Sequence, residues 1–230
     1  MNEKHSIDNE AIERSLENAS IRTDKVAIVT GASRGIGAEV AEHLASDGFT
    51  VIVNYSRVRQ APDELVETIV SAGGQALAVQ ADVSSPTEVR RLFETAEGEF
   101  GGVDVLVNNA GVMSLAKQEE TDDATFSQMI SVNLQGTFNT LREGATRVRR
   151  GGRIINFSSS VLGSQLPTHG VYSATKAAVE ATTVLLAKEM RGREVTVNAV
   201  APGPTATQLF LRGKPPEVVE RMSKARRGGA

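Results

Sequence analysis

The stretch that decides the fold is VAIVTGASRGIG, residues 26–37, in which an apolar run leads into a turn rich in glycine. Four consecutive apolar residues are typical of a strand that is buried on both faces of a parallel sheet. Gly31, Gly35 and Gly37 follow, and small residues at this spacing let the chain turn tightly from a strand into a helix. The start of such a helix offers free N–H groups to an anion, so the stretch predicts a site for the pyrophosphate of a dinucleotide.

The same turn has a simpler interpretation, in which it only joins a strand to a helix. A third interpretation, a P-loop, has little support because the stretch lacks a Gly-Lys-Ser/Thr sequence.

Strand-like and helix-like segments alternate outward from this stretch. Apolar runs predict strands over 26–29, 50–53, 76–79, 103–107, 153–157 and 195–200. Helices are predicted over about 36–46, 62–72, 86–98, 122–148 and 172–190, and Ser85-Pro86-Thr87-Glu88 combines a capping box with Pro at the first helical position. The alternation predicts an α/β fold with a doubly wound, Rossmann-like, mostly parallel sheet of six strands flanked by helices.

We expect one domain, a dinucleotide-binding catalytic domain over residues 25–212. Residues 1–24 are polar and without a clean period, which favours a flexible extension over an amphipathic helix. Residues 213–230 form a short C-terminal segment without a strand-like run.

Composition excludes several classes of function. The 25 Lys and Arg against 28 Asp and Glu give a net charge of −3, which offers no basic surface to nucleic acid. The chain has no Cys, and its three His are scattered, so neither a disulfide nor a metal site is expected. No apolar run approaches the roughly 20 residues that span a membrane, and no signal peptide is recognisable. We therefore expect a cytoplasmic protein that acts on a small molecule.

The end of the second predicted strand bears on cofactor choice. A fold that prefers NAD usually has an acidic residue here, bound to the ribose 2′-hydroxyl. This chain has Asn54, followed by Tyr55, Ser56 and Arg57, and Arg34 can reach the same place. A guanidinium binds a 2′-phosphate with two hydrogen bonds, so we predict NADP(H) in preference to NAD(H). The alternative is that both arginines are solvated surface charges.

Tyr172 and Lys176 are the candidate acid–base pair. Residues four apart share one face of a helix, which brings the ammonium beside the phenol. Lowering the phenol pKa from about 10 to near neutral takes roughly 4 kcal/mol, a plausible demand in a desolvated cleft. The spacing alone is weak evidence, because Tyr55 and Arg59 share it. The serines at 158–160 follow a predicted strand, where a hydroxyl can orient a substrate carbonyl.

Together these residues resemble the short-chain dehydrogenase/reductase family, and most of all its branch of 3-oxoacyl reductases and sugar or xenobiotic dehydrogenases. The resemblance covers about residues 24–210. Its motifs also include Asp82-Val83, Asn108-Asn109-Ala110-Gly111, Asn133 and Pro202-Gly203. Each motif is weak alone, whereas all of them in order on the expected elements are highly specific.

The resemblance implies a role for each matching residue. Asp82 would contact the adenine, Asn133 would hold a water in a proton relay, and Lys176 would bind the nicotinamide ribose. By its simpler reading, Asn133 is a satisfied core amide. The expected cofactor-binding set is Gly31, Ser33, Arg34, Gly35, Ile36, Gly37, Asn54, Tyr55, Ser56, Arg57, Asp82, Val83, Asn108, Ala110, Gly111, Tyr172, Lys176, Pro202, Gly203, Thr205 and Thr207. The expected catalytic set is Asn133, Ser160, Tyr172 and Lys176.

The identity of the catalytic serine is open between two positions. The family's usual count of thirteen residues before the tyrosine gives Ser159, and its usual count of three residues before a glycine, here Gly163, gives Ser160. We prefer Ser160. Alternate residues of a strand face opposite sides, so only one of the two is expected in the cleft.

The expected activity is reversible, NADPH-dependent reduction of a ketone or aldehyde to an alcohol, with Tyr172 as general acid and base. The family usually continues through another helix and a seventh strand, whereas 30 residues follow Val200 here. An open sheet edge leads us to expect at most a homodimer through helices 122–148 and 172–190, in place of the usual tetramer. The alternative is a truncated relative that binds dinucleotide with little turnover. The substrate itself does not follow from the sequence.

Overall fold

The computed structural model describes residues 25–211 and residue 217. The expected N-terminal extension, residues 1–24, and all of the C-terminal segment 213–230 except Glu217 lie outside the described residues.

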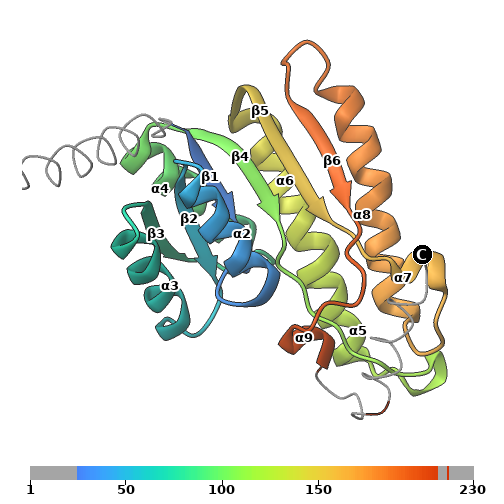
Figure 1. The fold of residues 1–230 in the computed structure, drawn as a ribbon. Coiled ribbons are helices and arrows are strands. Elements are labelled where there is room, and N and C mark those ends of the chain that lie inside the picture. The colour runs from blue at the N-terminus through green and yellow to red at the C-terminus, as the bar shows by residue number, and fades with distance from the viewer. Residues whose placement is uncertain (1–24, 212–216, 218–230) are drawn as a thin grey trace, which may run out of the picture.

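The structure is built on one sheet of six parallel strands, as predicted (Figure 1). The spatial order is β3-β2-β1-β4-β5-β6, with β1 in the middle. The order reverses between β1 and β4, where sheets of this kind bind their ligands beyond the carboxyl ends of the strands. The strands are β1 (Val26–Val29), β2 (Thr50–Tyr55), β3 (Gln75–Gln80), β4 (Val103–Asn108), β5 (Val148–Phe157) and β6 (Thr196–Val200).

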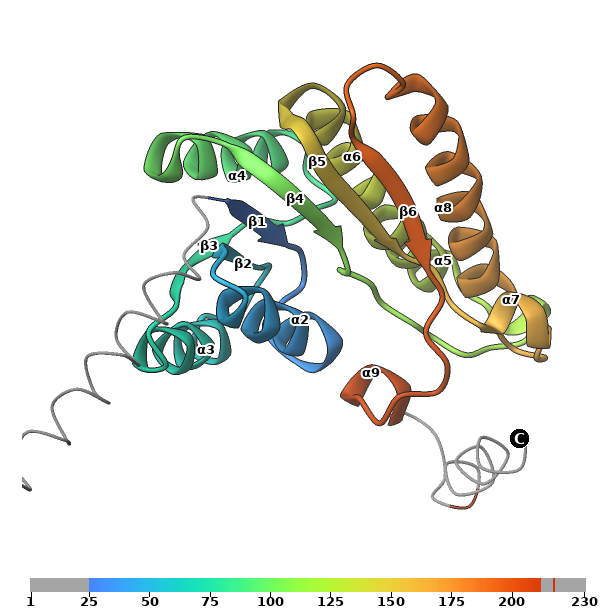
Figure 2. The same cartoon turned by 45° about the horizontal axis from the view of Figure 1, so that its top comes forward.

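Helices cover both faces of this sheet (Figures 1 and 2). On one face α2 (Gly35–Ser46) and α3 (Gln60–Ser71) pack against the β1–β3 side. On the other face lie α4 (Pro86–Phe100), α6 (Gly136–Arg147) and α8 (Gly170–Glu189). The remaining helical segments, near the carboxyl edge, are η1 (Gln118–Glu120), α5 (Asp123–Met129), η2 (Ile130–Gln135), α7 (Val161–Ser164) and α9 (Gln208–Leu211).

The apolar run that forms β1, Val26–Val29, supplies residues to both halves of the core. Successive strand residues point to opposite faces, so Val26 and Ile28 join the cluster under α4, α6 and α8. Ala27 and Val29 join the cluster under α2 and α3. All four are buried, which explains why this strand is uniformly apolar rather than alternating.

The segment predicted as one helix over 122–148 is divided into three parts. It begins at α5, where the Asp122 carboxylate accepts the Thr125 N–H at 2.7 Å. Residues Ile130–Gln135 then form a π-helix, and α6 completes the segment. The extra residue in a π-turn changes the direction of the side chains, and such turns are frequent at functional sites. Asn133 lies inside it.

The capping box predicted at the start of α4 is only half formed. Ser85 accepts the Glu88 N–H at 3.4 Å, as expected of an N-cap. The Glu88 carboxylate instead accepts the N–H of Asp82 at 2.8 Å. The pair therefore fixes the chain where β3 leads into the carboxyl edge.

Among the residues that the structure describes, no helix is both long and apolar enough to cross a membrane.

Candidate active site

The turn after β1 is held rigidly by side chains from two neighbouring strands. The Thr30 hydroxyl accepts the N–H groups of Asn109 and Ala110 at 3.0 and 3.1 Å, and it donates to the Val107 carbonyl at 3.2 Å. The Asn109 amide donates to the carbonyls of Thr30 and Gly31, both at 3.0 Å. These bonds fix the turn against the start of the segment that follows β4.

Glycine is required in this turn by conformation and by space. Gly31 has a φ of 62°, and a Cβ there would lie 2.8 Å from the Ala110 Cα. Arg34, the N-cap of α2, has extended backbone, and no side chain caps the helix. The first N–H groups of α2 therefore remain available to an anion. Because Gly31 has no side chain, an anion can also approach the backbone of the turn closely. The cradle fits a pyrophosphate.

We expect Gly37→Ala to weaken NADPH binding by at least about tenfold, because its Cβ would lie 2.4 Å from the Asn109 amide nitrogen and 2.7 Å from the Gly31 carbonyl. Both atoms belong to the clamp that shapes the turn. Fluorescence titration of NADPH measures the change. Gly98→Ala is the control, because a Cβ there meets no atom within 4 Å. An unchanged dissociation constant for Gly37→Ala would contradict the role given to this turn.

The structure gives Asn54 a different place from the one expected. It is buried, with its Oδ1 accepting the Gly31 N–H at 3.3 Å and its Nδ2 donating to the Ala81 carbonyl at 3.0 Å. The side chain thus supports the turn from below and connects β2 to the end of β3. Tyr55 is also buried.

Three polar side chains around this point remain exposed: Arg34, Ser56 and Arg57. Arg34 donates to the neutral Gln208 amide oxygen at 3.0 Å. Neither arginine forms a salt bridge within residues 25–211. Next to them, the half-buried Asp82 carboxylate accepts the Ser84 N–H at 2.9 Å and Ser84 hydroxyl at 2.7 Å.

Tyr172 and Lys176 lie on the buried face of α8, at the carboxyl end of β5. The Lys176 Nζ donates to the Phe157 carbonyl at 2.7 Å and lies 5.8 Å from the centre of the Tyr172 ring. Lys176 is 5% exposed and Tyr172 8%. The predicted pair is therefore brought together, and its ammonium is held by the last carbonyl of the strand.

Burial raises the pKa of the Tyr172 phenol above its ordinary value of 10, and the interaction with the Ser159 side chain lowers it by less. The net lowering that we expected from Lys176 is thus not found in the protein without cofactor, because burial outweighs the lowering contribution. Burial also lowers the pKa of Lys176 to about 8. At neutral pH the phenol is protonated, the form that can donate a proton.

Both serines line the cleft, and the contact with Tyr172 favours Ser159 over Ser160, which we preferred. Ser159 is half-buried and interacts with Tyr172, and its hydroxyl also accepts the Val161 N–H at 3.3 Å. Ser160 is exposed, and it has already turned into the helical conformation that starts α7. The count back from Gly163 misleads because Gly163 lies within α7, so the residue three positions earlier is the N-cap of that helix.

Asn133 connects two walls of the site. Its amide accepts the Val112 N–H and donates to the Val112 carbonyl, both at 2.8 Å, and it donates to the Thr175 hydroxyl at 3.2 Å. Both amide protons are therefore used within the protein. The side chain ties the segment after β4 to α8, and only its acceptor atoms remain for a water.

The motif after β4 divides between the cleft and the core. Gly111 lies in the cleft, and a Cβ there would be 3.8 Å from the Lys176 Nζ. Asn108 is instead buried between strands, where its Nδ2 donates to Asn156 Oδ1 at 2.8 Å. Its side chain does not line the cleft as we expected. Val83 is likewise buried, against Gly136 of α6.

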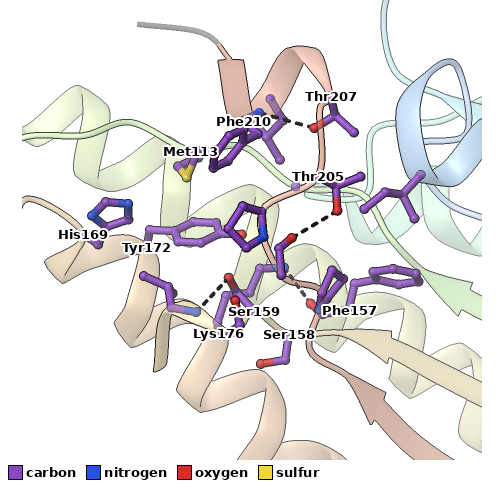
Figure 3. A pocket seen from close by; sticks show the side chains of 18 of the residues that line it. Met113, Phe157, Ser158, Ser159, His169, Tyr172, Lys176, Thr205, Thr207 and Phe210 are labelled. Atoms are coloured by element: carbon purple, nitrogen blue, oxygen red, sulfur yellow. Dashed lines mark hydrogen bonds between the residues drawn. The ribbon is translucent and has the colours of Figure 1, made fainter. Parts of the chain in front are cut away.

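One cleft is lined by Ile36 at the end of the phosphate turn, by the clamp residue Asn109 and by the acid–base pair, part of which Figure 3 shows. Pro202, Gly203, Thr205 and Thr207 form the wall beyond β6, as expected. The opposite wall carries Met113 and His169 next to Tyr172 (Figure 3). Leu166, Leu209 and Phe210 make the rest of this end apolar.

Comparison with known proteins agrees with this geometry. A family model described as short chain dehydrogenase matches residues 25–215. The chain belongs to the short-chain dehydrogenase family. Its members are oxidoreductases, and the fold and motif order found here are those that the sequence predicted.

This short-chain dehydrogenase has relatives that share most of its length. It is 45% identical over 206 residues to a short-chain type dehydrogenase/reductase of Picea abies, covering 85% of this chain and 76% of the relative. It is 41% identical over 213 residues to an Arabidopsis thaliana chloroplastic protein named NADPH-dependent aldehyde reductase-like, covering 86% and 79%. A Burkholderia cenocepacia short chain dehydrogenase solved in complex with NADP superposes with a TM-score of 0.82 at 32% identity, covering 87% and 82%.

Sequence reasoning gave no individual role to three residues of this short-chain dehydrogenase site. Asn109 was recognised only as part of a motif, although its amide clamps the turn. Ser158 lines the cleft, and its hydroxyl donates to the Glu180 carboxylate at 2.6 Å. His169 lines the cleft one helical turn before Tyr172. The i, i+3 spacing of His169 and Tyr172 was a signal that could have found the histidine.

Proposed function

We propose that the protein reduces a ketone or aldehyde to an alcohol with NADPH, reversibly. The observation that carries the proposal is the placement of a protonated, buried Tyr172 phenol beside Ser159, in the same cleft as the phosphate turn. Nothing in the proposal depends on a metal, and no cluster of metal-binding side chains occurs in residues 25–211.

The chain's own residues would act on the carbonyl oxygen. Ser159 orients this oxygen by a hydrogen bond, and Tyr172 gives it the phenolic proton as the carbon is reduced. The bound nicotinamide supplies the hydride that reduces the carbonyl carbon. The nearby Lys176 ammonium stabilises the phenolate that remains, and the phenol is then reprotonated from solvent.

The relay to solvent is the least constrained step. We propose that a water on the acceptor atoms of Asn133 takes part, since both of its amide protons are used elsewhere.

NADP(H) in preference to NAD(H) is supported by charge. Arg34 and Arg57 are exposed and without a carboxylate partner in the described part of the chain, and position 54 carries an amide instead of an acid. A 2′-phosphate would meet cations and no repelling carboxylate. The Arabidopsis relative is named for NADPH, and the Burkholderia structure holds NADP.

We expect Arg57→Ala to lower kcat/KM for NADPH by about 10- to 100-fold, the value of one charge-assisted hydrogen bond, and to leave kcat/KM for NADH nearly unchanged. Steady-state kinetics with each cofactor measure the ratio. Arg59→Ala is the matched control, because this exposed arginine is paired with Asp63 at 2.9 Å. Equal losses with both cofactors would remove Arg57 from phosphate recognition.

The remaining cofactor contacts are proposed by position. We propose the adenine near Asp82, the ribose along Ala110 and Gly111, and the nicotinamide beside Pro202 and Thr205.

We also propose a homodimer. Phe126 on α5 and Phe138 on α6 are 48% and 52% exposed, and burying them against a second copy would remove apolar surface from water. Light scattering at micromolar concentration tests this, and a monomer would contradict it.

The activity is tested by NADPH oxidation over a panel of ketones and aldehydes, with the alcohol identified by mass spectrometry. We expect stoichiometric alcohol and NADP⁺. Tight NADPH binding without oxidation of any carbonyl would instead support the alternative of a dinucleotide-binding protein with little turnover.

A further inference from the structure

His169 lies at the inner end of the cleft with one ring nitrogen committed and the other free. It is the N-cap residue of α8, three positions before Tyr172, and is 8% exposed. Its Nδ1 lies 2.9 Å from the Pro167 carbonyl oxygen. A carbonyl can only accept, so Nδ1 must carry the proton, and the neutral ring then presents Nε2 as an acceptor.

The Nε2 atom has no hydrogen-bond partner within residues 25–211. Among those residues, Asn108 Oδ1 is the one side-chain nitrogen or oxygen that is fully buried and has no hydrogen-bond partner. Since Nε2 of His169 also has no partner, it is not fully buried. His169 lines the cleft and is otherwise buried. A ligand would therefore reach Nε2 from the cleft. Figure 3 shows the ring beside Tyr172 and Met113. An acceptor that is nearly buried and opens onto the cleft is placed to receive a hydrogen bond from a donor group of a bound ligand.

The surroundings of His169 define the rest of that ligand. Met113, Leu166, Leu209 and Phe210 are apolar residues that line the same cleft, and Figure 3 shows Met113 near His169. Tyr172 and Ser159 are donors toward the reacting carbonyl, whereas Nε2 of His169 is an acceptor three residues before Tyr172, at the N-cap of α8. Around His169 the cleft therefore combines the hydroxyls of Tyr172 and Ser159, the separate acceptor Nε2 and apolar lining.

We propose that His169 is a specificity-determining residue that selects carbonyl substrates carrying a hydroxyl on an otherwise apolar, ring-sized body. The hydroxyl donates to Nε2 while the carbonyl oxygen faces Tyr172. This inference rests on the proposed carbonyl reduction and adds the substrate class to it. A methoxy group at the same place lacks the donor and loses the bond.

The probes are 3′-hydroxyacetophenone, 4′-hydroxyacetophenone and their methoxy counterparts. For each pair, the ratio of kcat/KM for the hydroxylated to the methoxylated ketone is measured in the wild type and in His169→Asn. The asparagine amide can still donate to the Pro167 carbonyl, so the loop keeps its bond, but the acceptor at Nε2 is removed. We expect the better of the two ratios to fall by about tenfold, the value of one hydrogen bond, with the methoxylated ketones little affected.

The same ratio taken from dissociation constants, measured by calorimetry in the presence of NADP⁺, does not depend on turnover. A ratio that is unchanged by His169→Asn in binding overturns the role of His169, whether or not the ketones are reduced. A ratio that falls in binding while no ketone is reduced supports the role of His169 and counts against the proposed reaction. Loss of NADPH binding in the variant would show a structural role only and would also overturn the inference.

Discussion

Tyr172→Phe is expected to lower kcat/KM for carbonyl reduction by about a thousandfold, within the range found when a general acid is removed. The phenylalanine ring fills the same space between α8 and Met129 and Val161, which form a small apolar cluster with Tyr172. Folding and NADPH affinity should therefore remain close to those of the wild type. Single-turnover kinetics with saturating NADPH measure the chemical step directly.

The matched control for this change is Tyr55→Phe, which removes a hydroxyl from the other tyrosine of the chain. Tyr55 is buried at the end of β2 and has no part in the proposed reaction. Its loss should leave kcat within about twofold, since no transition-state contact is removed. A Tyr172→Phe enzyme that keeps wild-type kcat would show that the proton comes from another group.

Lys176→Met is expected to abolish turnover and, at the same time, to stabilise the fold at neutral pH. Burial lowers the pKa of Lys176 to about 8, against an ordinary value of 10.5, so the folded protein bears the cost of a buried ammonium. Removing the buried ammonium raises the free energy of unfolding by about 3 kcal/mol. Losing the hydrogen bond to the Phe157 carbonyl lowers it by about 1 kcal/mol. We expect unfolding in urea at pH 7 to show a gain of about 2 kcal/mol.

The pH dependence of this gain has a definite sign. Below pH 8 Lys176 is protonated in both the folded and the unfolded protein, so the full cost of burying its ammonium lowers the stability of the wild type. As pH rises from about 8 to 10.5 the folded protein releases its proton first, so the wild type gains stability and the advantage of Lys176→Met shrinks. Lys188→Met, at an exposed position of the same helix, is the control and should show no such trend. A variant less stable than the wild type at pH 7 would contradict the account.

The fold could be predicted because its signals are local. Four apolar residues in a row, 26–29, indicate a strand buried on both faces. The glycines that follow stand where the tight turn needs positive φ values or close backbone contacts. Tyr172 and Lys176 share a helix, so their proximity also follows from a short piece of chain. Parallel strands bring the remaining motifs to one edge once the alternation of elements is known.

The errors have in common that they depend on where single side chains point and which groups they contact. The choice between Ser159 and Ser160 is decided by where β5 ends and α7 begins. Asn54 points beneath the phosphate turn because Gly31 and Ala81 offer it partners there. The pKa of Tyr172 is raised by burial and lowered by less through the Ser159 side chain, and neither effect can be read from the spacing of Tyr172 and Lys176.

The most direct measurement follows the hydride itself. NADPH carrying deuterium at the transferable position of the nicotinamide is incubated with enzyme and a reducible ketone or aldehyde, and the alcohol is analysed by mass spectrometry and NMR. The account predicts one deuterium on the carbinol carbon with the wild type and almost none formed over the same time by Tyr172→Phe. Alcohol without deuterium, or equal deuterium transfer by both proteins, would contradict it.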